Sequence, residues 1–235
     1  MLKPIVLAIQ NDETDPPHLA GIWLAEIGCE IQVVHAYRGE SVPALVPANI
    51  AAIMPLGGHM GANDDSAYSF LTNEKLLLAD AIARDIPVLA ICLGAQLLAV
   101  AGGGTVSRAA EAEIGIYKIT LNDAGLKDSV LKLGTSALTA QWHEDVVTEI
   151  PVGATLLASS PLCENQIFRM GSSIYAFQSH PELDASIISA WEGNPDNAFL
   201  DSGKSSVESE VAKHEEELKR TWKPVIQSCG KLLLK

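Results

Sequence analysis

The amino-acid sequence predicts a three-layer α/β/α fold, in which helices cover both faces of a mostly parallel, doubly wound sheet. Before Gly102, short apolar runs typical of buried strands alternate with stretches of helical periodicity. Strands that alternate with helices form right-handed crossovers, which place parallel strands in one sheet. After Gly104 the stretches become shorter and alternate in polarity, which predicts a small extension of antiparallel or mixed strands.

The individual elements are predicted from the same patterns. Buried strands are expected at residues 4–9, 31–36, 51–56 and 87–91, with helices at 17–27 and 66–84. Asp64, Asp65 or Ser66 is available as the N-cap of the second helix. The shorter strands are expected at residues 114–121, 138–142, 146–150, 165–170 and 174–178, with turns at 122–123, 151–153 and 171–172.

The domain organisation is predicted from length and from the C-terminal pattern. The chain has 235 residues, 48% of them apolar, which is enough for one sizeable core. We expect a principal domain at residues 1–196 and an amphipathic helical extension at 197–235 that packs on the same domain. Val207, Val211, Leu218 and Trp222 recur there at helical spacing. A helix of this kind packs on the domain surface, or alternatively binds a partner or covers an active site.

The composition disfavours several classes of function. A formal net charge of −13 without a basic cluster repels polyphosphate backbones, so we expect no nucleic-acid partner. The first apolar run is too short for a signal peptide and no run reaches membrane-spanning length, so no membrane association is expected. The four cysteines show neither metal-binding spacing nor the density of a disulfide scaffold. Reduced thiols and a cytoplasmic location are therefore expected.

Cys92 stands at the junction between an apolar strand and an apolar helix, with Gly94 two residues later. In a nucleophile elbow, such a turn holds the reactive side chain at the carboxyl end of the sheet. The helix N-terminus favours thiolate over thiol, because its unpaired N–H groups stabilise negative charge. A buried structural cysteine is the alternative for Cys92. Cys29, Cys163 and Cys229 have no comparable surroundings and are read as structural.

His180 ends another apolar strand and is followed by Pro181 and Glu182. A cysteine nucleophile needs a base that takes its proton and returns it to the departing amine. That base needs a third group that fixes its orientation. Glu182 can fill this role because Pro181 restricts the backbone between the two side chains. Cys92, His180 and Glu182 are therefore predicted to form a catalytic triad.

Two glycines, Gly57 and Gly58, follow the strand expected at residues 51–56, which should lie beside the strand that leads to Cys92. Glycine lets a backbone N–H group face a reacting carbonyl without a β-carbon in the way. The N–H groups of Gly58 and Leu93 are predicted to form an oxyanion hole. By itself this is a weak signal, since two glycines in sequence most often form an ordinary turn.

Together these segments resemble the class I (triad) glutamine amidotransferases, in particular the branch similar to the glutaminase domain of GMP synthase. The matching stretches occur in the family's order over residues 3–190; they are 56–61, 91–96, 113–115, 141–145 and 177–182. The resemblance implies a flavodoxin-like fold and a γ-glutamyl thioester formed on Cys92. It also implies that Gln96 contacts the substrate, with backbone around Glu144 and Asp145 holding its amino-acid end. A helix-surface amide is the alternative for Gln96, and for His143 a structural role in a loop is preferred.

Four positions depart from the family's pattern, and none of them is a predicted catalytic residue; they are His59, Ala90, Ile116 and Ser179. His59 stands where the oxyanion loop often has proline, and Ser179 where an aromatic residue often precedes the catalytic histidine. Both should lie near the pocket, so both bear on the choice of substrate. We include His59 among the substrate-binding candidates.

The predicted function is hydrolysis of the glutamine side-chain amide, with release of ammonia. The chain has no Gly-x-x-x-x-Gly-Lys-Ser/Thr phosphate loop, so an ammonia-accepting synthetase would be a separate protein. A stand-alone γ-glutamyl hydrolase or peptidase is one alternative, and a non-catalytic binding module is another. Cysteine peptidases and redox sensors of similar architecture typically have histidine after the elbow cysteine, where this chain has Leu93. A small-molecule substrate is expected, without a cofactor or a metal site.

Overall fold

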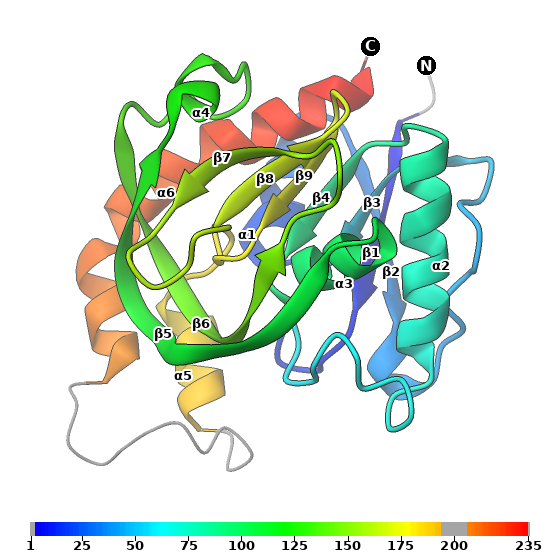
Figure 1. Ribbon diagram of the computed structural model, residues 1–235, viewed down its shortest axis with the longest axis horizontal. Coiled ribbons are helices and arrows are strands. Elements are labelled where there is room, and N and C mark those ends of the chain that lie inside the picture. Colours follow the sequence, from blue (N-terminus) through cyan, green and yellow to red (C-terminus); the bar gives the residue numbers. More distant parts are fainter. Residues whose placement is uncertain (1–2, 194–205, 235) are drawn as a thin grey trace.

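The computed structural model describes residues 3–193 and 206–234, which fold around one sheet (Figure 1). The strands are β1 Ile5–Gln10, β2 Glu30–His35, β3 Ile50–Pro55, β4 Val88–Ile91, β5 Thr105–Leu121, β6 Ser136–Glu149, β7 Thr155–Ser159, β8 Ile167–Met170 and β9 Ile174–Phe177. The α-helices are α1 His18–Glu26, α2 Phe70–Ala83, α3 Leu93–Ala101, α4 Asp123–Lys127, α5 Ala185–Glu192 and α6 Val207–Lys231. The described residues also form two short 3-10 helices, η1 Ala36–Arg38 and η2 Leu232–Leu234.

The parallel half of the sheet follows the predicted doubly wound pattern. The strand order is β2-β1-β3-β4-β9-β8-β7-β5-β6. Strands β2, β1, β3, β4 and β9 are parallel, whereas β8, β7, β5 and β6 continue the sheet in antiparallel pairs. The predicted α/β fold class is confirmed, and so is its antiparallel extension. This arrangement brings the carboxyl ends of β1, β3, β4 and β9 to one edge, where ligands of such sheets bind.

Helices cover both faces of the parallel strands, because these strands are apolar on both sides. Val6 and Ala8 of β1 belong to one buried cluster and Leu7 and Ile9 to another. The first cluster includes residues of α1, α5 and α6, and the second includes residues of α2 and α3. Figure 1 shows α6 crossing one face of the sheet, with α2 and α3 on the opposite side. The three predicted layers are therefore present.

The antiparallel extension differs from the prediction in its lengths. Residues 138–142 and 146–150 are not two strands, because 136–149 form the single strand β6. Its partner β5 begins at Thr105 rather than 114, and the two pair along a curved ribbon (Figure 1). The register shifts between Arg108 and Glu113, where several side chains are exposed. The alternation of buried and exposed residues is interrupted there, so the sequence pattern did not predict this part of the strand. Strand β7 was not predicted.

Two predicted boundaries are wrong, and both errors concern acidic or amide side chains in turns. Helix α2 begins at Phe70 rather than residue 66, and its N-cap is Ser69. Asp64 instead accepts a hydrogen bond from the Gly61 N–H at 2.7 Å, which closes a turn of the preceding loop. The turn predicted at 122–123 is the start of α4, whose first N–H groups are capped by the Asn122 side chain.

Helix α6 is longer than the predicted C-terminal helix and continues through Pro224. Its apolar side chains join the cluster that it shares with α1 and α5. Trp222 is fully buried, and its Nε1–H donates to the Leu138 carbonyl of β6 at 3.0 Å. The predicted boundary between residues 196 and 197 lies outside the described residues. A partner-binding role for this helix stays a prediction.

Within the described part of the chain, no helix combines the length and the apolar character that a bilayer span requires.

We expect Trp222→Ala to lower the free energy of unfolding by about 3 to 5 kcal/mol, because it leaves a cavity under α6 and an unpaired Leu138 carbonyl. Chemical denaturation followed by circular dichroism measures this change. The matched control is Arg220→Ala, at an exposed position on the same helix, which should change stability by less than about 0.5 kcal/mol. Equal effects of the two substitutions would contradict an anchoring role for Trp222.

Candidate active site

Cys92 occupies the turn between β4 and α3 in a backbone conformation that side chains rarely adopt. Its φ is 49° and its ψ is −111°. Such a conformation costs roughly 1 to 3 kcal/mol and persists only where the surroundings enforce it. The Cys92 N–H donates to the Phe177 carbonyl of β9 at 2.8 Å, and its carbonyl accepts from the Gln96 N–H at 3.1 Å. The predicted elbow is present at the carboxyl end of the sheet.

Gly94 makes this turn possible because it lies directly against β3. Its N–H donates to the Leu56 carbonyl at 3.1 Å. A β-carbon at position 94 would overlap with the Pro55 carbonyl, so other side chains do not fit. The same contact places the first turn of α3 beside the glycine loop after β3. A β-carbon at Gly58 would lie 3.1 Å from Leu93 Cδ2, so the two predicted oxyanion-hole residues lie side by side.

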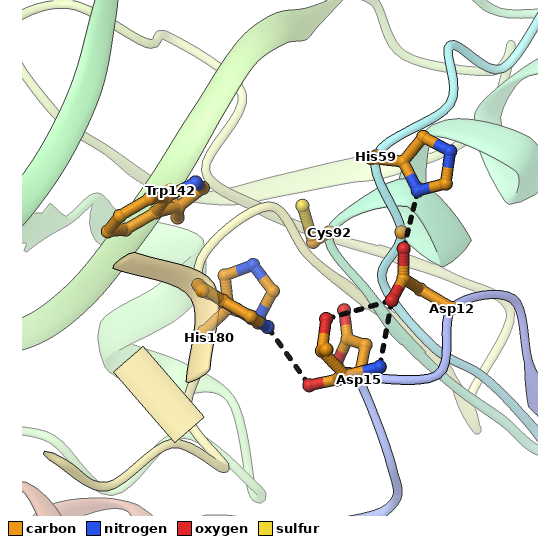
Figure 2. Close-up of a pocket in the computed structure, with 9 residues that line it drawn as sticks. Asp12, Asp15, His59, Cys92, Trp142 and His180 are labelled. Atoms are coloured by element: carbon orange, nitrogen blue, oxygen red, sulfur yellow. Dashed lines mark hydrogen bonds and ion pairs between the residues drawn. The ribbon is translucent and has the colours of Figure 1, made fainter. Parts of the chain in front are cut away.

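His180 lies beside Cys92 at the end of β9 (Figure 2). Its N–H donates to the Ala140 carbonyl of β6 at 2.9 Å, which fixes the backbone where the strand ends. The ring Nδ1 lies 2.8 Å from Glu182 Oε1, and both side chains are buried. Burial by itself lowers the pKa of His180, but the negative charges of Cys92 and Glu182 outweigh it and raise the pKa well above its ordinary value.

Two cavities meet at Cys92. The large cavity has a volume of about 410 Å³ and lies on the α3 side; its lining residues are Gly58, His59, Met60, Gly61, Asp64, Cys92, Leu93, Gln96, Arg108, Ile114, Trp142, His143, Glu144 and Asp145. The small cavity has a volume of about 40 Å³ and lies on the histidine side; its lining residues are Asp12, Thr14, Asp15, Gly58, His59, Cys92, Trp142, His180 and Trp191. Cys92 is thus open to two spaces, of which the described lining of only one includes His180.

Comparison with known proteins places the chain in a family. Residues 23–190 match the family model described as glutamine amidotransferase class-I. The chain belongs to this family. The match includes the Cys92 elbow, His180 and Glu182, so the expected resemblance to class I glutamine amidotransferases is confirmed.

The curated relatives match part of this chain, whereas a solved structure matches nearly all of it. The glutamine amidotransferase-like protein YfeJ of Salmonella typhimurium is 32% identical over 71% of this chain and 70% of its own length. Gamma-glutamyl peptidase 3 of Arabidopsis thaliana is 34% identical over 43% of each chain. A subunit of the glutamine-hydrolyzing GMP synthase of Saccharolobus solfataricus is 42% identical over 42% of this chain and 52% of its own. A solved glutamine amidotransferase from Methylobacillus flagellatus covers 98% of this chain and 95% of its own, with 27% identity and a TM-score of 0.83.

In this class I amidotransferase, the predicted substrate-binding residues all line the large cavity. Gln96 is buried and its Nε2 donates to the Asp145 carbonyl at 2.9 Å, so it is not a helix-surface amide. The side chains of Glu144 and Asp145 both pair with Arg108. His59 is half exposed at the rim of both cavities and pairs with Asp12.

His143 was expected in a loop, and this expectation is wrong, because the residue lies within β6. Its Nε2 lies 3.2 Å from Glu113 Oε2 and 3.1 Å from Gln141 Oε1. Glu113 is itself buried and accepts from Ser160 Oγ at 2.6 Å and from Gln166 Nε2. This polar cluster ties β5 and β6 to the segment before β8, so it supports the wall of the large cavity.

Several cavity residues were not predicted from the sequence. Asp12 and Asp15 follow β1, and the rule that ligands bind at the carboxyl ends of parallel strands gave a signal for them. Trp191 of α5 had no such signal, because the approach of α5 to His180 is tertiary. The centroids of the Trp191 and His180 rings lie 4.9 Å apart. Gln178 had a weak signal as part of the motif before His180; its Nε2 lies 4.0 Å from Cys92 Sγ.

Asp15 is a second buried carboxyl beside the His180–Glu182 pair. Asp15, His180 and Glu182 each offer one potential metal-ligand atom, and these three atoms lie within 4.8 Å of one another. Three such atoms are a set that could hold a cation, although the sequence predicted no metal site here. Burial raises the pKa of Asp15 to about 7, against the lowering effect of His180, and Glu182 and Asp12 raise it further. Near neutral pH this carboxyl is therefore partly protonated.

Glu74 of α2 forms a buried brace under the glycine loop. Asn11 Nδ2 donates to Glu74 Oε1 at 3.3 Å and to the Leu56 carbonyl at 3.1 Å. Leu56 directly precedes Gly57 and Gly58, so the brace holds the start of the loop. Burial raises the pKa of Glu74 to about 8, although the Asn11 hydrogen bond lowers it.

The raised pKa of Glu74 predicts a loss of stability as the pH rises. The folded chain binds this proton more tightly than the unfolded chain, in which the ordinary pKa is 4.5. Its stabilising effect is complete below pH 4.5 and is lost as the pH rises through about 8. Relative to Glu74→Gln, the wild type should lose on the order of 5 kcal/mol between these limits, measured by denaturation at a series of pH values. The matched control Glu111→Gln, at an exposed position, should follow the wild-type pH profile.

Proposed function

We propose that this chain hydrolyses the γ-glutamyl amide bond of glutamine through Cys92, His180 and Glu182, with release of ammonia. The observation that carries this proposal is the position of Cys92. It stands at the junction of a cavity of about 410 Å³ and a buried His180–Glu182 pair. A reacting carbonyl bound from the large cavity meets the sulfur on one side and the imidazole on the other.

The first half of the reaction forms a thioester. Cys92 Sγ attacks the amide carbonyl while His180 Nε2 holds the proton that the thiol has given up. The N–H groups of Gly58 and Leu93 stabilise the negative charge that develops on the carbonyl oxygen. When the carbon–nitrogen bond breaks, His180 gives the proton to the departing nitrogen, which leaves as ammonia. Glu182 keeps Nδ1 of His180 protonated and so keeps Nε2 directed at the reacting atoms.

The second half of the reaction returns the enzyme to its starting state. A water molecule gives a proton to His180 and attacks the thioester carbonyl, and the proton then returns to the sulfur. Glutamate leaves from the large cavity. Gln96 contacts the substrate, and the backbone around Glu144 and Asp145 holds its amino-acid end. Arg108 pairs with both acidic side chains and fixes this segment in place.

The nitrogen compound that leaves distinguishes two candidate functions, and each is supported by one of the named relatives. The relative that is one subunit of a GMP synthase supports a separate synthetase that accepts ammonia. A γ-glutamyl peptidase supports a second candidate function, which is hydrolysis of other γ-glutamyl compounds without an acceptor. The chemistry at Cys92 is the same for both functions. They differ in the leaving group, which is ammonia for glutamine and an amine for other γ-glutamyl compounds.

Cys92→Ala should abolish glutamate formation from glutamine and from other γ-glutamyl amides, because no other described sulfur lines either cavity except the thioether of Met60. A glutamine-mimicking electrophile should add to the wild type at Cys92, detected by peptide mass spectrometry. The control is Cys163→Ala, at a buried cysteine away from both cavities, which should still be labelled. Undiminished turnover in Cys92→Ala would remove this residue from the mechanism.

Glu182→Gln should lower kcat by at least about 100-fold, because a neutral amide neither holds the imidazole tautomer nor stabilises its protonated form. Steady-state kinetics measure this loss, and thermal unfolding checks that the variant is folded. Glu164→Gln removes the same charge at an exposed position and should leave kcat unchanged. A folded Glu182→Gln variant with wild-type kcat would contradict the assigned role.

A further inference from the structure

The small cavity lies where the leaving group of the proposed reaction departs. His180 lines this cavity and delivers the proton to the departing nitrogen. The large cavity holds the glutamyl part, so the nitrogen and its substituents extend to the opposite side of Cys92. Figure 2 shows Cys92 beside His180 and Trp142, with Asp12 and Asp15 on the adjoining wall. The side chains that line this cavity therefore contact the group attached to the amide nitrogen.

Carboxyl groups dominate the charge of the small cavity. Asp12 and Asp15 both line it, and none of its described lining residues is a lysine or an arginine. Burial raises the pKa of Asp12, but hydrogen bonds from His59 and Thr14 outweigh this effect and hold the pKa below its usual range. Asp12 is therefore an anion at neutral pH. His59, its ion-pair partner, offsets this charge only when its ring is protonated.

Asp15 adds an independent sign that the cavity receives a ligand. Its side chain is 3% exposed, and its Oδ1 is buried without a hydrogen-bond partner among the described residues. An unpaired buried acceptor is costly, and a donor that enters the cavity satisfies it. An N–H group of the leaving amine is such a donor.

Two tryptophans complete the walls. The rings of Trp142 and Trp191 lie 5.5 Å apart, and Trp191 Nε1 donates to the Thr14 carbonyl at 3.0 Å. This hydrogen bond ties α5 to the loop that carries Asp12 and Asp15. The faces of aromatic rings bind apolar groups and attract cations, whereas they repel a carboxylate. With a volume of about 40 Å³, the cavity has room for ammonia or a small amine.

We propose that the small cavity is a leaving-group subsite that accepts ammonia and small neutral or cationic amines and rejects amines that carry a carboxylate. This inference rests on the proposed function, because it concerns what leaves during the same reaction. The bond that breaks is the amide carbon–nitrogen bond, the glutamyl carbon joins Cys92 Sγ, and the proton on His180 passes to the amine. A free amino acid is thereby excluded as a leaving group when its carboxylate must lie beside Asp12 and Asp15.

The test uses four substrates that share the γ-glutamyl group and differ in the leaving amine. They are glutamine, γ-glutamylglycinamide, γ-glutamylglycine and the mono-γ-glutamyl amide of ethylenediamine. Glycinamide and glycine have nearly the same size and differ by one negative charge. Glutamate is the common product, so one coupled assay at pH 8 follows all four. We expect kcat/KM for γ-glutamylglycine to be at least about tenfold below that for γ-glutamylglycinamide, since like charges repel strongly in a partly buried site.

The preference for the neutral amine should depend on Asp12. The measured ratio is kcat/KM for γ-glutamylglycinamide divided by kcat/KM for γ-glutamylglycine. In Asp12→Asn this ratio should fall by about fivefold or more, because the substitution removes the charge of the side chain and keeps its shape. The ratio does not depend on the fraction of active enzyme, so a poorly folded variant does not distort it. The matched control is Glu13→Gln, the next residue, which is exposed and pairs with Arg38 outside the cavity. In the wild type, added salt should also lower the ratio by screening the charge.

The possible results separate this inference from the proposed function. If glutamine yields no glutamate, the proposed function fails and the subsite fails with it. If glutamine is hydrolysed and γ-glutamylglycine is cleaved as efficiently as γ-glutamylglycinamide, the subsite inference alone is overturned. An unchanged ratio in Asp12→Asn also overturns it, as does an equal change in Glu13→Gln. Cleavage of glutamine but not of the glycinamide or ethylenediamine compound would show exclusion by size, which likewise rejects selection by charge.

Discussion

The close approach of Gly94 to β3 is the constraint on which the rest of the site depends. It brings the first turn of α3 against the Pro55 carbonyl and forces Cys92 into its left-handed backbone conformation. The strained turn leaves Cys92 open to both cavities and places Leu93 beside the glycine loop. Hydrogen bonds from Cys92 to β9 and from Gly94 to Leu56 hold the geometry in place. The sheet thus supplies the stability that offsets the strain at the nucleophile.

In the proposed reaction, Cys92 divides the space around it into two environments with different tasks. The large cavity presents backbone and side-chain polar groups to the part of the substrate that stays on the enzyme. The small cavity combines the general base with carboxyls and tryptophans on the side from which the amine departs. The described lining of the large cavity lies within the residues that match the family model, whereas Asp12, Thr14, Asp15 and Trp191 of the small cavity lie outside that range. Specificity for the leaving group can therefore differ from relatives with the same nucleophile, base and glutamyl subsite.

Three buried carboxyls surround the reacting groups, and each is held differently. Glu182 pairs with His180, and Asp15 lies close enough to interact electrostatically with both. Glu74 accepts a hydrogen bond from Asn11, which supports the start of the glycine loop. Burial raises the proton affinity of Asp15 and Glu74, so neither simply adds a fixed negative charge at neutral pH. This lets the chain concentrate acidic residues near the site while limiting their mutual repulsion.

The parallel half of the fold and the identity of the triad candidates can be predicted from the amino-acid sequence alone. Local periodicity is a short-range property, and the segments around Cys92 and His180 each carry a strand-end motif that can be read without knowing its neighbours. Only the tertiary structure decided what surrounds them. The approach of Trp191 to His180, the position of Asp15 and the burial of Glu74 arise from contacts between distant segments. The unbroken β6 and the displaced start of α2 have the same cause, because pairing across a curved ribbon and competing turn hydrogen bonds override local patterns.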